Sequence, residues 1–174
     1  MDQITILARQ TESAYAWTNK LLHAIPHEKW DTTPDVVESN ISWQTGHLIV
    51  SLYYHSILVI VGHQMDILQQ VPLKEYSQLF TNAAPANASG KMKPEQLQAH
   101  LLFMQQRSIG VIKSLSPAGL EASLAPVQPP HPIAKNKWEA LEWNIQHTMW
   151  HCGQIGLLKR IIDKRFDFGL QTEG

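Results

Sequence analysis

The sequence lacks the features that mark secreted, membrane-spanning and nucleic-acid-binding proteins. It has one cysteine among 174 residues, so it cannot form an internal disulfide. Its longest purely aliphatic run, residues 57–61, is far shorter than the ~20 residues that cross a bilayer. No basic segment followed by an apolar one stands at the start, so no signal peptide is expected. The 14 Lys and Arg are balanced by 15 Asp and Glu and form no basic block. We therefore expect a cytoplasmic protein that has neither nucleic acid nor a membrane as a partner.

Several familiar catalytic motifs are also missing. A di-iron bundle needs a Glu-x-x-His unit on each of two helices, and the sequence has none. It also has no His-Glu-x-x-His zinc-protease motif, no phosphate-binding Walker loop, no Gly-x-Gly-x-x-Gly, no Gly-x-Ser-x-Gly and no Cys-x-x-Cys. The nine histidines are what remains as a source of chemistry.

The composition is that of one globular domain. Hydrophobic residues make up 44% and charged residues 17% of the chain, a balance typical of folded proteins. The length suits a single core, and neither an internal repeat nor a linker divides the chain. We therefore expect one domain over residues 1–174.

Four long helices are predicted, over residues 3–25, 40–64, 94–114 and 136–165, because apolar residues recur there at steps of three or four. Either Asn40 or Ser42 can cap the second of them. No segment alternates with period two, so we expect an all-α four-helix bundle. The connection over 65–93, with a short helix at 73–80, is long enough to cross back along a helix of about 35 Å. The helix order is then up-down-down-up, although an up-down-up-down order also fits these lengths. The proline-rich segment 116–135 is predicted to have no helix.

The sequence His147-Thr-Met-Trp-His151 offers a metal site. Residues four apart lie on the same face of a helix, about one turn from each other. The pair belongs to an inward-facing stripe that consists of Asn144, His147, His151, Ile155, Leu158 and Ile162. Since unsatisfied imidazole nitrogens are costly to bury, the pair needs a partner, and a metal ion is one.

A third ligand has to come from another helix, and His47 is our choice. Gly46 beside it lacks a side chain, which suits a close approach of two helices. His55 is turned about 80° from His47 on a helical wheel and is not expected to share the ion. His100 has no evident partner. The others, His23, His27, His63 and His131, are interpreted as solvated or capping groups.

Four neighbours could support the site. Asn144 and Gln154 lie one turn before His147 and one turn after His151, and each is either a hydrogen-bond partner of the ligands or a solvated polar residue. Trp43 and Trp150 are close enough in sequence to form its walls. Cys152 is turned about 100° from its neighbour and is interpreted as a packing residue.

These motifs resemble the DinB superfamily. The resemblance rests on Ser42-Trp-Gln-Thr-Gly-His47-Leu48, preceded by a loop of the form Ile-Pro-x-x-x-Trp-x-x-x-Pro, on His147-x-x-x-His151-x-Gly-Gln154-Ile, and on the long crossover. It implies a four-helix bundle with up-down-down-up topology, in which His47, His147 and His151 bind divalent nickel or zinc. It also implies a homodimer. Relatives often have a basic residue after the last histidine, where this chain has Cys152.

The resemblance implies three alternatives for function. Relatives with assigned chemistry include transferases and an isomerase that use a low-molecular-weight thiol, and a metal ion favours the thiolate form of such a cofactor. Other relatives are described as metal-dependent hydrolases, in which bound water would attack. A stress-related dimer with a purely structural metal is the third. No glutamate beside the motif is placed to act as a base, which favours thiol transfer to a small-molecule substrate.

Overall fold

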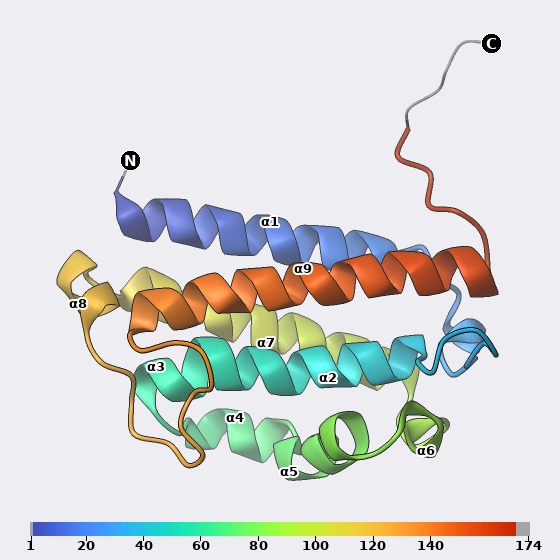
Figure 1. Ribbon diagram of the computed structural model, residues 1–174, viewed down its shortest axis with the longest axis horizontal. Helices are drawn as coiled ribbons and strands as arrows, with labels where there is room; N and C mark the ends of the chain where they lie inside the picture. The colour runs from blue at the N-terminus through green and yellow to red at the C-terminus, as the bar shows by residue number, and fades with distance from the viewer. Residues whose placement is uncertain (1, 170–174) are drawn as a thin grey trace.

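Four long helical segments run side by side and make up most of the molecule (Figure 1). The computed structural model describes residues 2–169, so residue 1 and residues 170–174 of the predicted domain lie outside the described part. The segments are α1 (Gln3–His23), α2 (Ile41–Tyr53) continued by η2 (Tyr54–Leu58) and α3 (Val59–Val61), α7 (Pro94–Ser114), and α9 (Lys137–Ile162). Within residues 2–169 there is no strand, only an isolated bridge between Ser123 and Asn136. The all-α prediction is confirmed.

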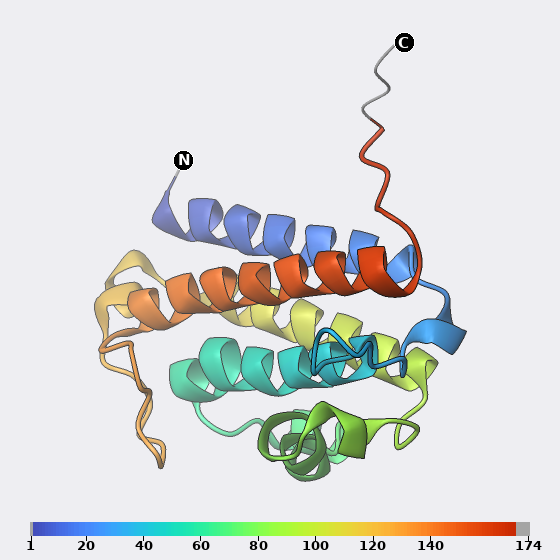
Figure 2. The same ribbon diagram turned by 45° about the vertical axis from the view of Figure 1, so that its right-hand side comes forward.

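The chain reverses direction after α1 and again before α9. α2 runs opposite to α1, a crossover returns the chain along one side, α7 then runs in the same direction as α2, and α9 runs with α1 (Figures 1 and 2). The crossover consists of α4 (Met65–Gln70), α5 (Leu73–Ser77), η3 (Gln78–Asn82) and α6 (Pro85–Ala88). The remaining short helices are η1 (His27–Lys29) and α8 (Pro117–Glu121).

The long helices begin where the sequence predicts; the third also ends as predicted, at Ser114, and the other three end earlier. The side chains of Asn40 and Asn136 cap α2 and α9 by accepting from backbone N–H groups three residues on. The first helix ends at His23 instead of residue 25, and the second helical segment at Val61 instead of residue 64. The last helix ends at Ile162 instead of residue 165. Asp163, directly after this end, binds the buried ammonium group of Lys159 through its carboxylate.

Two predictions about the connections are wrong in detail. Residues 116–135 contain α8, which Pro117 begins and the Ser116 hydroxyl caps through the N–H of Gly119. The crossover contains α4 and α6 in addition to the predicted short helix. That predicted helix is found as α5 and η3. In α6 and α8 a proline occupies the first turn, where it is tolerated, so the prolines of these segments do not exclude a helix.

The second helical segment lies in the centre of the core. By length and composition, Ile41–Val61 is apolar enough to cross a membrane, but 72% of its most apolar window is buried inside the fold. Its side chains pack on α7 and α9 and on the crossover, so its apolar residues are buried in the core of the fold. This position brings one face of α2 against the histidine pair of α9.

Candidate metal centre

The structure brings together His47 from α2 and the pair His147 and His151 from α9. One ring nitrogen from each lies within 4.8 Å of the others. The Nε2 atoms of His147 and His151 are 3.2 Å apart. Two nitrogens bound to one tetrahedral zinc at about 2.0–2.1 Å are separated by about 3.3 Å, which agrees with that distance. The three side chains therefore fit one divalent ion.

The orientation of His151 is fixed by a glutamine that the sequence analysis missed. Gln44, one turn before His47 on α2, uses its amide nitrogen to donate to Ser39 Oγ and Gln154 Oε1, each at 2.8 Å. Its Oε1 therefore accepts from Nδ1–H of His151, at 2.5 Å. With the proton on Nδ1, the lone pair of His151 Nε2 is available to the centre, as is common for metal-bound histidines.

The orientation of His47 is fixed by a backbone carbonyl of the crossover. Its Nδ1 donates to the oxygen of Phe80 at 2.7 Å, which leaves Nε2 as the ligating atom. Gly46 makes this contact possible, since a Cβ there would lie 2.2 Å from Cδ2 of Phe80. The expected close approach at Gly46 is confirmed, and the segment that approaches is η3.

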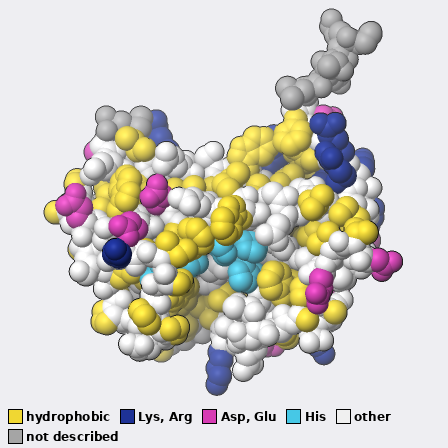
Figure 3. Space-filling model, viewed as in Figure 1, with side chains coloured by type: hydrophobic (Ala, Val, Ile, Leu, Met, Phe, Trp, Pro, Cys, Tyr) yellow, Lys and Arg dark blue, Asp and Glu magenta, His cyan; other side chains and the backbone are white. Residues whose placement is uncertain are grey.

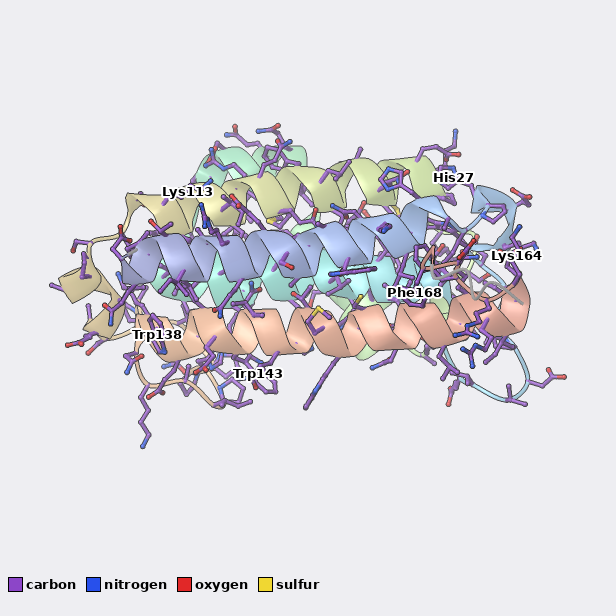
Figure 4. All side chains as sticks on the ribbon, turned by 90° about the horizontal axis from the view of Figure 1, so that it is seen from above. His27, Lys113, Trp138, Trp143, Lys164 and Phe168 are labelled. Atoms are coloured by element: carbon purple, nitrogen blue, oxygen red, sulfur yellow. The ribbon has the colours of Figure 1, made fainter. Side chains whose placement is uncertain are left out.

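Two tryptophans flank the centre, and only one of them is a predicted wall residue. Trp43 stacks on His47, with ring centroids 4.9 Å apart and planes at 12°. Trp143 stacks on His147 at 6.0 Å and projects from the side of α9 that faces away from α7 (Figure 4). Trp150 is 61% exposed and meets the edge of Trp143 instead. The spacing of Trp143, one turn before His147, was the available signal.

The predicted polar neighbours have different surroundings. Gln154 is linked to His151 by Gln44: Oε1 of Gln154 accepts a hydrogen bond from the Gln44 amide, and Oε1 of Gln44 accepts one from His151. The amide of Asn144 donates to the Tyr15 hydroxyl at 3.0 Å, in a buried polar contact between α9 and α1. Cys152 is buried and lines a cavity between the same two helices, which agrees with a packing role.

Burial keeps the three histidines neutral. It lowers the pKa of His151 from 6.5 to about 3 and that of His147 to about 4, and the neighbouring His47 adds to both shifts. The pKa of His47 is lowered as well, chiefly by burial. Neutral imidazole is the form that coordinates a metal, so the centre is ready to bind at neutral pH.

Two more histidines adjoin the centre. The ring of His55 lies 5.3 Å from that of His147, and its Nδ1 is 2.8 Å from Nε2 of His131. His131 was interpreted as a solvated or capping group. Its Nδ1 does accept from backbone N–H groups, but the ring is buried because its loop folds against η2, where it stacks on Tyr54. His100 also has a partner, the hydroxyl of Tyr76 at 2.7 Å.

The centre reaches the molecular surface. His47 and His147 are partly exposed, and histidine side chains form a patch on the face where α9 and α2 meet (Figure 3). Hydrophobic side chains border this patch. The centre therefore lies at the edge of the core, with His151 buried and the other two histidines next to solvent.

Comparison with known proteins identifies the family. No curated protein matches the chain. A crystal structure of a conserved protein from Enterococcus faecalis is similar in fold, with a TM-score of 0.69 and 13% identity, over 93% of this chain and 98% of that one. Residues 10–155 match the sequence profile of the DinB superfamily. The chain belongs to the DinB superfamily.

Proposed function

We propose that His47, His147 and His151 hold one divalent ion, zinc or nickel, and that the protein is a metal-dependent transferase that uses a low-molecular-weight thiol. The observation that carries the proposal is the convergence of three neutral imidazole nitrogens, within 4.8 Å of one another, on a solvent-accessible face. Three protein ligands are typical of catalytic sites, which keep a position open for water or substrate.

The residues of the centre favour an anionic ligand. Three neutral imidazoles bring no negative charge, so the positive charge of the site is left for the incoming group to balance. The ion, when bound, would lower the pKa of a thiol or a water molecule at its open position. Gln44 and the Phe80 carbonyl hold the imidazoles in place, and Trp43 and Trp143 offer apolar walls to the body of a small-molecule substrate.

Thiol transfer is favoured over hydrolysis by the ligand set. A hydrolase needs a base for the attacking water, and the cluster found within residues 2–169 consists of histidines, with no carboxylate. A thiolate is itself the nucleophile and needs no such base once it is formed. The family resemblance supports the same choice.

The framework we propose is a cytoplasmic homodimer of four-helix, up-down-down-up bundles. Trp17, Met149 and Leu157 are 39–51% exposed and line an apolar cavity of about 410 Å³ between α1 and α9, away from the histidines. A second copy of the chain would cover these side chains. Light scattering of the purified protein would give its mass in solution.

Metal content tests the core of the proposal. We expect about one zinc or nickel per chain by elemental analysis. His147→Ala and His151→Ala should each lose most of it, because two imidazoles hold an ion far less tightly than three. His100→Ala, which removes a histidine bound to Tyr76 outside the cluster, should keep full content. Full metal content in both His147→Ala and His151→Ala would contradict the proposal.

The same preparation distinguishes the functions. Cobalt-substituted protein should give a sulfur-to-metal charge-transfer band with a biological thiol, and His151→Ala should abolish it. Metal-dependent cleavage of an ester or amide, with no thiol band, would establish the hydrolase instead. A fourth protein ligand around the ion would indicate a structural metal.

A further inference from the structure

His55 and His131 form a pair whose proton positions follow from their hydrogen bonds. Nδ1 of His131 lies 2.9 Å from the backbone nitrogen of Ala134 and 3.2 Å from that of Ile133. Both nitrogens carry a hydrogen, so Nδ1 of His131 accepts, and the ring proton must be on Nε2. The Nε2–H group then donates to Nδ1 of His55 at 2.8 Å.

It follows that His55 carries its own proton on Nε2. Its Nδ1 is occupied as an acceptor, so a neutral ring has only Nε2 left for hydrogen. In this state His55 has no free lone pair for a metal, although its ring lies 5.3 Å from that of His147. His131 thus keeps His55 from being a fourth ligand and makes it a hydrogen-bond donor at the edge of the centre.

In the described part of the chain, the Nε2–H donor of His55 is not used by the protein itself. The two nitrogens of an imidazole point to different sides of the ring, so Nε2–H is directed away from His131. It has no hydrogen-bond partner within residues 2–169. The fully buried side-chain N and O atoms without a partner in that part of the chain are Asp31 Oδ1 and Ser42 Oγ. His55 Nε2 is not one of them, so this atom is not fully enclosed, although the residue is only 8% exposed.

We propose that Nε2–H of His55 donates a hydrogen bond to the ligand held at the three-histidine centre. The centre would then prefer ligands that carry an acceptor oxygen, such as a carboxylate or a carbonyl, beside the metal-bound atom. His55 is a ligand-binding residue in this scheme, and His131 is the positioning residue that sets its tautomer. The proposal rests on the proposed metal site and assigns it a substrate feature.

The tautomers can be measured in metal-free protein. Long-range ¹H–¹⁵N spectra distinguish a protonated from an unprotonated ring nitrogen, and we expect the Nε2–H form for both His55 and His131. His131→Phe removes the donor that fixes His55, so the His55 signals should move toward a mixture of tautomers. An Nδ1–H form of His55 in the unmodified protein would overturn the proposal.

Ligand binding tests the role of the donor. Acetate is titrated into cobalt-substituted protein and followed by visible absorption. His55→Phe should keep one cobalt per chain and bind acetate about tenfold more weakly, since it loses a hydrogen bond to a charged group. His55→Gln, whose amide can donate from a similar position, should restore most of the affinity. His100→Phe serves as the matched control and should behave like the unmodified protein.

The outcomes separate this proposal from the proposed function. Equal acetate affinity of His55→Phe and the unmodified protein would overturn the role of His55 while the metal site stands. Loss of cobalt from His55→Phe would show that His55 is a ligand, which also overturns it. Failure of the unmodified protein to bind cobalt would contradict the proposed function, and the role of His55 would fall with it.

Discussion

Gln44 illustrates how much of the centre depends on a single side chain. It is almost fully buried, and its amide joins Ser39 and Gln154 to His151. Both ends of the amide are used, so it cannot rotate without losing hydrogen bonds. The result is a His151 ring held in one tautomer and one orientation.

We predict that Gln44→Met lowers metal affinity by about tenfold to a hundredfold, as is usual when a partner of a metal-bound histidine is removed. The new side chain has a similar length but cannot accept from Nδ1–H of His151. Competition with a chelator measures the change. Gln154→Ala removes a group one step further out and should change the affinity by much less. Equal effects of the two substitutions would argue against the orienting role of Gln44.

Whether a contact in the site could be predicted depends on how far apart its two residues lie in the sequence. The common face of His147 and His151 follows from the rotation of about 100° per residue within one helix. Gln44 and His151 are 107 positions apart in the chain, so their contact depends on the lengthwise offset at which α2 packs against α9. The same holds for His55 and His131, 76 positions apart. The periodic pattern of apolar residues within one helix carries no information on the offset between two helices.

At the scale of elements, the contact between α2 and η3 connects the core to the centre. Phe80 is fully buried, and its ring covers Gly46 while its carbonyl holds His47. The π-helical turn that contains Phe80 is of a kind that often occurs at functional sites. The packing of the crossover against α2 and the orientation of the proposed metal ligand His47 therefore both depend on Phe80.

We predict that Gly46→Ala destabilises the protein by about 1–3 kcal/mol, the usual cost of overpacking a core. Metal affinity should also fall, because the Phe80 ring cannot stay where a Cβ would lie 2.2 Å away. Denaturant unfolding and a metal titration measure the two effects. Gly110→Ala on α7 is the matched control. A Cβ there meets nothing within 4 Å, and alanine should stabilise the helix by about 0.5–1 kcal/mol. Similar stability of both variants would contradict the prediction.

The elements themselves were predictable where the signal is local. Asn40, Asn136 and Pro94 mark helix starts, and each does so in the structure. The π-helical turns η2 and η3 were not predicted, because they continue a helical periodicity with a single wider turn. Short helices such as α8 give too few residues for a period to be recognised.

At the scale of the whole molecule, the buried histidines make stability depend on pH. Burial lowers the pKa of six histidines, namely His47, His55, His100, His131, His147 and His151. In the unfolded chain their pKa is about 6.5, so the unfolded state binds more protons as the pH falls below that value. Protonation therefore favours unfolding. The carboxylates whose pKa is lowered, Asp2, Glu95 and Asp163, stay ionised between pH 7 and 5 and do not oppose this trend.

We predict that metal-free protein loses roughly 6 kcal/mol of unfolding free energy between pH 7 and pH 5. His55 and His151, each with a pKa of about 3, and His147, with a pKa of about 4, contribute about 2 kcal/mol each. Urea unfolding at the two pH values measures the loss. His55→Phe should reduce it by about a third, because one of the three rings no longer takes up a proton on unfolding. Equal stability at pH 7 and pH 5 would mean that the histidines already bind protons in the folded state, and such rings could not hold a metal.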